Sequence, residues 1–346
     1  QSTAYLASKF SYLTRTWVAG SNPRSPAGYI GGVLLDDLEH TRLPLGINVR
    51  DDIFHLPDSF DARQRWPECT SLNEIRDQGC CGSAWAVSAA STMTDRWCIH
   101  SKGKDVFTFG SHDLLSCCHA CGAGCNGGTL GPAWNFWVEK GVSSGGQFNS
   151  KQGCHPYPID TCHGAEEADT PKCLKKCRDG YKVQDTWQDR RYGRVAYSLP
   201  NDDEKIMEEI YMNGPVQTSI RIYMDLTTYK SGVYKHTWGP LAGGHALEII
   251  GWGSESGVKY WLCKNSWGET WGDRGFVKIV RGENHIGIEE HVHSGLPSFA
   301  GGHFLVIIGW GSESGVKYWL CKNSWGETWG DRGFVKIVRG ENHIGI

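Results

Sequence analysis

The residues best suited to catalysis are a cysteine-rich turn, one histidine and one asparagine that lie far apart in the sequence. The turn RDQGCCGSAW, residues 76–85, opens a predicted helix over residues 84–99 that contains no Gly or Pro. A helix N-terminus stabilises an anion, and with a nearby imidazolium it lowers the pKa of a thiol placed there. His245 follows two glycines, and Asn265 ends a predicted strand. Cys, His and Asn together predict a nucleophile, a base and a residue that orients the base.

The elements that must position these residues differ between the two halves of the chain. In the helix over 84–99, apolar residues recur at helical spacing, which indicates a buried face. Residues 110–182 are rich in Cys, Gly and Pro, so we predict loops that disulfides must order. Strand-like runs HALEIIGW, VKYWLCKN and GFVKIV follow His245, separated by Gly-rich turns. This pattern predicts an α+β fold, helical first and then β-rich.

Composition excludes several classes of function. The 346 residues carry 35 Lys plus Arg against 38 Asp plus Glu and are 39% hydrophobic. This length predicts about two domains or one two-lobed domain. No run approaches the roughly 18 to 20 uncharged apolar residues of a membrane span, and the small net charge indicates no nucleic-acid partner. Fourteen Cys favour an oxidising route, lysosomal or extracellular. Since residue 1 is Gln, we expect a processed or partial chain, with any signal peptide outside it.

The C-terminal part repeats an earlier segment almost without change. Residues 242–288 recur as residues 300–346 at an offset of 58, with 45 of 47 positions identical. The copies differ only at Ala246/Phe304 and Glu248/Val306. Solenoid repeats drift in sequence and need at least about three units, so the pair indicates a recent segment duplication or an assembly error.

We therefore interpret residues 299–346 as an appended tail. His303 and Asn323 are copies of His245 and Asn265, but no second nucleophile turn or helix accompanies them. We expect no second site there. We also expect the tail to form an unpaired, aggregation-prone set of strands.

The chain resembles the papain family of cysteine peptidases, and within it the cathepsin B group, over roughly residues 9–298. The motifs that carry the resemblance are RDQGCCGSAW, LLSCC, GCNGG, GGHALEIIGWG, KNSWGETWGDRGF and RGENHIGI, with TWVAG and Gly31–Gly32 matching the group's prosegment. The resemblance implies a papain-like two-lobed fold, with a helical left lobe and a β-barrel-like right lobe. It also implies an inhibitory prosegment, residues 1–55, before a peptidase domain, residues 56–298.

The same resemblance assigns roles to four residues and exposes one departure. It implies that Gln78 donates to the oxyanion, His245 is the base, Asn265 orients it and Trp267 shields their bond. Where the family has its nucleophilic Cys, this chain has Ala84. A methyl group cannot attack a carbonyl, so we predict negligible peptidase activity.

Two explanations of this alanine remain open. In the first, the chain is a non-catalytic homologue that binds peptides. In the second, it is an active lysosomal, secreted or digestive endopeptidase whose nucleophile was mutated by design or misread. Natural decay is favoured by further departures at Cys80, Val87, Cys263 and Lys264. Cys81 is a conceivable substitute nucleophile, but it lies in the turn before the helix, where the family uses it in a disulfide.

Substrate recognition follows from the cleft glycines and two departures from the group. Gly127 and Gly128 would let a peptide or protein substrate approach, although a tight turn would explain them equally well. His291 stands where the group often has an acidic residue at the floor of its second specificity pocket, which removes the reason to expect a basic preference. The loop Cys162–Glu167 keeps one His, flanked by acids that repel a carboxylate, so we predict no dipeptidyl-carboxypeptidase action.

The cysteines alone do not determine their connectivity. The resemblance implies the pairs Cys69–Cys98, Cys81–Cys125, Cys117–Cys173, Cys118–Cys121 and Cys154–Cys177, and leaves over Cys80, Cys162, Cys263 and Cys321. A zinc site at Cys117, Cys118, His119, Cys121 and Cys125 is the alternative, but the spacing lacks a paired layout of two and two ligands. We expect no metal and no cofactor.

Overall fold

The computed structural model describes residues 16–22, 31–46, 55–164, 166–299, 306–322 and 330–340. The chain forms two compact units, Gln1–Pro297, called the body, and Ser298–Ile346, called the tail. The α-helices are α2 (Ala62–Arg65), α3 (Ala84–His100), α4 (Ser111–Cys117), α5 (Leu130–Glu139), α6 (Thr186–Asp189) and α7 (Asp203–Asn213). The strands are β1 (Trp17–Ala19), β2 (Phe60–Asp61), β3 (Gly193–Leu199), β4 (Val216–Tyr223), β5 (Tyr229–Tyr234), β6 (Leu241–Glu255), β7 (Val258–Lys264), β8 (Phe276–Val280), β9 (Val292–Pro297), β10 (Val306–Glu313), β11 (Val316–Lys322) and β12 (Phe334–Val338).

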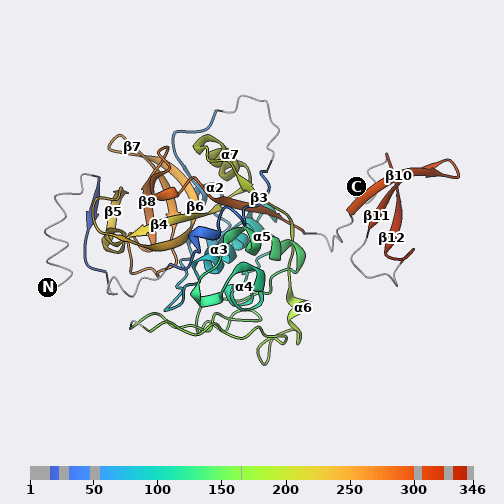
Figure 1. Cartoon of the computed structure of the whole chain (residues 1–346), viewed down its shortest axis with the longest axis horizontal. Coiled ribbons are helices and arrows are strands. Elements are labelled where there is room, and N and C mark those ends of the chain that lie inside the picture. The colour runs from blue at the N-terminus through green and yellow to red at the C-terminus, as the bar shows by residue number, and fades with distance from the viewer. Residues whose placement is uncertain are drawn as a thin grey trace. The chain divides into compact units, whose positions relative to one another are not determined.

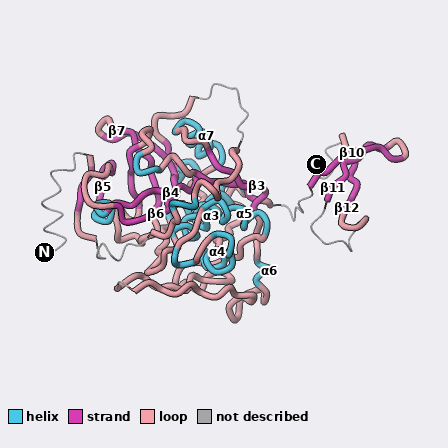
Figure 2. The backbone as a smooth tube through the Cα atoms, viewed as in Figure 1, coloured by secondary structure: helices cyan, strands magenta, loops and turns pink. Residues whose placement is uncertain are grey.

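The body separates a helical part from a sheet part (Figure 1). Its strands form one sheet in the order β1-β5-β8-β7-β6-β4-β9-β3, with β2 paired to β6. Strands β5 and β8 run parallel, whereas β6 is antiparallel to both β4 and β7. Figure 2 shows the helices α3, α4 and α5 gathered beside these strands.

Two hydrophobic cores correspond to the two parts. One contains Trp252 and Trp261 of the sheet. The other contains Trp85 of α3 and Trp134 of α5. Burying aromatic side chains of this size is a large stabilising contribution in each core. The α+β fold with a helical and a sheet lobe is therefore confirmed.

Helix α3 lies between the two lobes and is more buried than its periodicity predicted. It contacts α4 and α5 as well as β6 and β9. Every residue from Ala84 to Ile99 is buried, rather than one face only. Small side chains make this possible, and the hydroxyl of Ser88 donates to the carbonyl of Ala84 at 2.6 Å. The N-terminus of α3 is consequently shielded from water.

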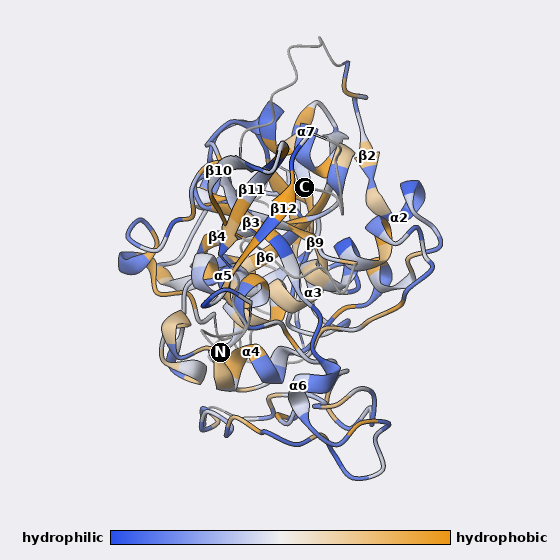
Figure 3. Ribbon diagram, turned by 90° about the vertical axis from the view of Figure 1, so that its right-hand side faces the viewer, coloured by the Kyte–Doolittle hydropathy of each residue, from blue (hydrophilic) through white to orange (hydrophobic). Residues whose placement is uncertain are grey.

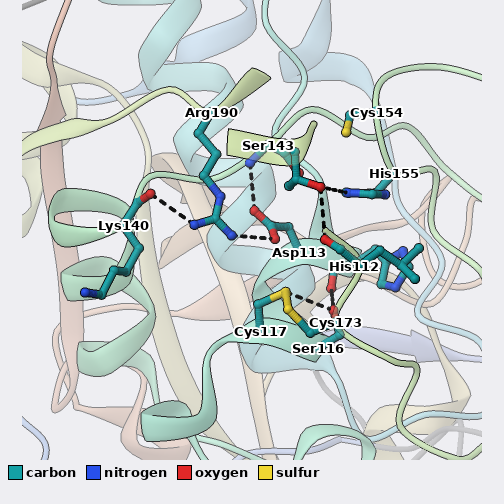
Figure 4. Close-up of polar contacts among 12 residues, drawn as sticks. His112, Asp113, Ser116, Cys117, Lys140, Ser143, Cys154, His155, Cys173 and Arg190 are labelled. Carbon is teal, nitrogen blue, oxygen red and sulfur yellow. Dashed lines mark hydrogen bonds and ion pairs between the residues drawn. A yellow bond between two sulfur atoms is a disulfide. The ribbon is translucent and has the colours of Figure 1, made fainter. Parts of the chain in front are cut away.

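Disulfides and buried polar contacts order the loop-rich region around α4 (Figure 4). Asp113 accepts from the backbone N–H of Ser143 at 2.9 Å and from the guanidinium of Arg190 at 3.1 Å. The Cys117–Cys173 bridge joins the end of α4 to a distant loop. The loops of this region are thus linked by a disulfide, as the sequence predicted.

The tail contains a three-stranded antiparallel sheet in the order β10-β11-β12. In Figure 3, strand β12 is hydrophobic at its beginning and its end and hydrophilic in between, in agreement with its sequence FVKIV. The strands pair with one another, so the expectation of an unpaired strand set is wrong in this respect. The outer edge of β10 still has no strand partner within the described residues.

Candidate functional site

The N-terminus of α3 forms the centre of the candidate site. Ser83 is the N-cap and Ala84 is the first helical residue, fully buried. The turn before it is held by the Cys81–Cys125 disulfide and by a 2.7 Å hydrogen bond from the N–H of Gly82 to the carbonyl of Cys125. Because Cys81 is bridged, its sulfur is not a free thiol in this structure.

His245 and Asn265 meet at the neighbouring ends of β6 and β7. The Nε2 atom of His245 lies 2.6 Å from Oδ1 of Asn265, and both side chains are buried. Trp267 stacks on the imidazole, with ring centroids 4.7 Å apart and an interplanar angle of 26°. The predicted orienting and shielding contacts are thus present in the geometry.

Burial controls the protonation of this histidine. Removal from water lowers the pKa of His245 to about 4, although the hydrogen bond with Asn265 opposes the shift. The imidazole is therefore neutral at physiological pH in this chain and has the form that a general base requires.

Two N–H donors converge on a single carbonyl oxygen at the head of α3. The Nε2 atom of Gln78 donates to the carbonyl of Gly31 at 2.9 Å, and the backbone N–H of Ala84 donates to the same oxygen at 3.3 Å. The hydroxyl of Ser266 donates to Oε1 of Gln78 at 2.8 Å, which sets the orientation of the amide. Paired donors aimed at one oxygen are the geometry of an oxyanion hole.

The carbonyl in this position belongs to the N-terminal segment, which passes through the site and forms isolated β-bridges at Val33. Gly32 and Val33 donate to the carbonyl of Gly244 at 3.0 and 3.1 Å. Leu34 donates to the carbonyl of Gly128, and Gly128 donates to that of Gly32, both at 3.0 Å. The segment therefore adds main-chain hydrogen bonds on both sides of the site.

The cleft glycines are required for two different reasons. A Cβ on Gly128 would lie 2.7 Å from the ring of Trp85, so a larger residue would displace the indole beside Ala84. Gly127 has a φ of +112°, which side chains disfavour. Gly128 is thus explained by its close approach to Trp85, and Gly127 is explained by its positive φ in a turn.

His291 lies apart from the His245–Asn265 pair, at the start of β9. It is buried, and its Nδ1 lies 4.0 Å from the carboxylate of Glu39 in the N-terminal segment. Burial lowers its pKa, with the carboxylate of Glu290 opposing the shift. A neutral, enclosed imidazole supplies no negative charge for a basic side chain.

The structure contains the five disulfides implied by the sequence resemblance, including those of Cys117, Cys118, Cys121 and Cys125. These four sulfurs are therefore not available to zinc. Within the described residues, no group of three or more metal-ligating side chains is arranged around a common point.

One further disulfide was missed. Cys80 and Cys162, treated as left over in the sequence, form a bridge across 82 residues. The only signal for it was that both lie in segments expected near the cleft. Cys263 and Cys321 are buried free thiols.

Sequence reasoning also missed a buried ion cluster directly behind Asn265. The Nζ atom of Lys264 lies 2.6 Å from Asp95 of α3 and 3.2 Å from Glu248 of β6. Burial and the charge of Asp95 raise the pKa of Glu248 well above its ordinary value. A protonated Glu248 would leave Lys264 and Asp95 as the charged pair. The cluster connects α3 to the end of β7, directly before Asn265.

The copies of the site residues in the tail, His303 and Asn323, lie outside the described residues, as does Phe304. In the part of the chain that the structure describes, no helix is long and apolar enough to cross a membrane.

Comparison with known proteins gives consistent results. The model of the papain family cysteine protease matches residues 56–296 and, separately, residues 297–346. The cathepsin B-like cysteine proteinase of Schistosoma japonicum is 41% identical over 270 residues, which are 75% of this chain and 78% of that protein. The gut-specific cysteine proteinase of Caenorhabditis elegans is 47% identical over 243 residues, 69% of this chain and 73% of the relative.

Solved structures agree at the level of the whole fold. Procathepsin B S9 from Trypanosoma congolense has a TM-score of 0.76 and 34% identity, covering 86% of this chain and 99% of its own. A digestive procathepsin L 3 of Tenebrio molitor has a TM-score of 0.62 at 22% identity, which supports the fold alone. The similarity to procathepsins extends the match to a chain that carries its prosegment. The chain therefore belongs to the papain family of cysteine proteases, as a cathepsin B-like zymogen homologue.

Proposed function

We propose that this chain is a catalytically inactive member of the cathepsin B-like group that binds its own prosegment, and peptides, in the cleft. The observation that carries the proposal is Ala84 at the head of α3, where the family has its nucleophile. Without a sulfur or hydroxyl at this position, no acyl intermediate can form. His245 then has no proton to remove from residue 84.

The remaining groups support a binding role. The donors of Gln78 and Ala84 both reach the Gly31 carbonyl, and Gly128 and Gly244 pair with the adjoining backbone. None of these contacts needs a thiol. A peptide that replaces the prosegment can use the same main-chain donors and acceptors.

The proposed organisation is a prosegment over residues 1–55, a papain-like domain over residues 56–298 and an appended tail over residues 299–346. Six disulfides favour a lysosomal or extracellular location. We propose that the cleft accommodates internal peptide segments. Glu166 and Glu167 beside His163 are exposed and would repel a substrate's C-terminal carboxylate.

The second candidate is an active cysteine endopeptidase in which the nucleophile was replaced by design or misread. The 2.6 Å His245–Asn265 contact and the converging donors favour this alternative, because decay would be expected to disturb them. Reading codon 84 of the source transcript separates the two candidates. A Cys codon supports the enzyme, and an Ala codon supports the inactive homologue.

The activity test compares the chain as it stands with Ala84→Cys and Ala84→Ser, each after removal of residues 1–55. Cleavage of a fluorogenic peptide should appear in the Cys variant at a rate on the order of 10⁶-fold above the other two, as for loss of a triad nucleophile. The Ser variant is the matched control, because it restores a polar atom without a thiolate. Cleavage by the unaltered chain would contradict the proposal, and a thiol-directed peptide probe would then show whether Cys81 reacts.

A further inference from the structure

The Cys80–Cys162 disulfide joins two segments that both border the site. We call residues 77–84 the donor turn, since it carries Gln78 and the N–H of Ala84. We call residues 157–164 together with 166–168 the buttress loop. The bridge connects them across 82 residues of sequence, and Cys162 is buried while Cys80 is half-buried. Neither cysteine takes part in the site described above.

Polar contacts join the same two segments on both sides of Gln78. The hydroxyl of Tyr157 donates to the carbonyl of Gln78 at 2.8 Å and lies 2.7 Å from the hydroxyl of Ser83. The hydroxyl of Thr161 donates to Asp77 at 3.2 Å. The N–H of Ala168 donates to the carbonyl of Cys80 at 2.6 Å.

A glycine in the donor turn makes the contact close. Gly79 has a φ of +65°, and a Cβ there would lie 2.2 Å from the carbonyl oxygen of Asp160. The two backbones can therefore approach only because residue 79 is Gly. At Gly79, the residue before Cys80, the donor turn thus lies directly against the buttress loop.

The donor turn needs such support because residues 78–83 belong to no helix or strand. Gln78 precedes α3, and its backbone N–H donates to the carbonyl of Ser266 at 2.9 Å. The Cys81–Cys125 bridge restrains the turn from one side only. Donors stabilise a developing or bound oxyanion only when they are held in place beforehand.

We infer that the Cys80–Cys162 bridge is a positioning element that keeps the donors of Gln78 and Ala84 aimed at the carbonyl bound in the cleft. Through the buttress loop, it restricts the conformations open to the donor turn. Loss of the bridge should weaken the hydrogen bonds of Gln78 and Ala84 to the Gly31 carbonyl more than it destabilises the rest of the body. The inference rests on the proposed binding of the prosegment in the cleft.

Hydrogen exchange of the full chain tests it. In Cys80→Ser/Cys162→Ser, the amides of Ala84, Gly32 and Leu34 should exchange roughly tenfold faster or more, while those of β4 stay unchanged. The control is Cys69→Ser/Cys98→Ser, which removes a bridge whose two cysteines lie outside both the donor turn and the buttress loop and should leave these three amides as they were. Unchanged exchange in the first variant, or equal acceleration throughout the body, would overturn the inference.

A double-mutant cycle separates positioning from general stability. Gln78→Ala removes one of the two donors, so bridge loss should open the Gly31 contact less in that background than in the unaltered chain. Additive effects would show that the bridge acts on stability alone. If the double Ser variant does not fold, Tyr157→Phe removes one contact of the same loop. It should accelerate exchange at Ala84, and unchanged exchange there would overturn the inference.

The same measurement distinguishes the two proposals. If the amides of Gly32 and Leu34 are unprotected in the unaltered chain, the prosegment does not occupy the cleft and the proposed binding function fails. If they are protected, and remain equally protected without the bridge, only the inference about Cys80–Cys162 fails.

Discussion

Nearly the same strand sequence occurs twice in this chain, as β6–β8 in the body and as β10–β12 in the tail, but its apolar side chains are buried in the first copy and largely exposed in the second. Trp252 is 1% exposed in the body, whereas its copy Trp310 is 70% exposed in the tail. Ile250 is fully buried and its copy Ile308 is 51% exposed. In the body, β4 pairs with the free edge of β6, and α3 and α7 contact that strand. Within the described tail residues, no element takes their place.

Pairing, in contrast, is identical in the two regions. Trp252 opposes Trp261 and Trp310 opposes Trp319, and the register shifts at the same place, between Ile249 and Gly251 in the body and between Ile307 and Gly309 in the tail. Local sequence therefore sets strand pairing and the bulge. Burial depends on neighbours that the repeated segment does not contain.

One of the two substitutions between the copies changes the buried ion cluster next to Asn265. Glu248, a partner of Lys264, is Val306 in the tail, where Lys322 is exposed. The tail copy therefore lacks one carboxylate of the buried ion cluster. Placing it in the body would leave Lys322 with Asp95 as its remaining acidic partner in that cluster.

The largest expected difference between the regions concerns catalysis restored by Ala84→Cys. In that background, His245→Ala should lower kcat on the order of 10⁶-fold, because it removes the base. His303→Ala should leave kcat unchanged, since the tail has no nucleophile turn. Peptide hydrolysis measures both, and an equal loss in the two variants would erase the distinction between body and tail.

Core packing gives the next largest contrast. Trp252→Ala should lower the free energy of unfolding of the body by about 3–5 kcal/mol, because it empties a packed site. Trp310→Ala should change it by less than about 0.5 kcal/mol, since the indole is already in water. Urea unfolding followed by circular dichroism checks both. A large cost for Trp310→Ala would mean that the tail side chain is covered in solution.

The buried ion cluster sharpens the comparison for charged residues. Lys264→Met should destabilise the body by about 3–5 kcal/mol, because it leaves Asp95 buried without its cation. Lys322→Met should change the free energy of unfolding by less than about 0.5 kcal/mol. Adding Asp95→Asn to Lys264→Met should recover part of the loss. Failure of this rescue would show that the charge of Asp95 is not the cause.

The smallest contrast is expected where both copies lie in water. Lys278 pairs with Glu255 in the body, and Lys336 pairs with Glu313 in the tail. Lys278→Ala should cost at most about 1 kcal/mol, because the pair is partly exposed. Lys336→Ala should not shift the midpoint of urea unfolding measurably. A difference larger than this would mean that environment matters even for the surface pairs.

Much of the site could be predicted from the sequence because its motifs are local. The turn around Gln78, the segment around His245 and the run from Asn265 to Trp267 each carry recognisable residues at short spacing. The departure at Ala84 was visible for the same reason. Helix α3 was also predicted, but not its burial on every side, because the elements that cover it lie elsewhere in the chain.

Other features depend on residues that give no signal alone. Cys80 and Cys162 lie in different segments, and only the path of the buttress loop brings their sulfurs together. Lys264 joins Asp95 and Glu248 from three separate elements. Neither the spacing of these residues nor the composition of the chain indicates these contacts, because long-range contacts depend on how the elements pack.

The sequence by itself indicated the strand runs that follow His245, the helix that begins at Ala84 and the presence of alanine at position 84, since these follow from short-range patterns and from the identity of single residues. The tertiary structure alone decided the convergence of Gln78 and Ala84 on the Gly31 carbonyl and the lowered pKa of His245. It also decided which copy of the repeated strands forms a core. The donors converge because segments far apart in the sequence pack together. The pKa of His245 falls because several such segments exclude water from its ring. No single segment contains all the residues that either effect needs.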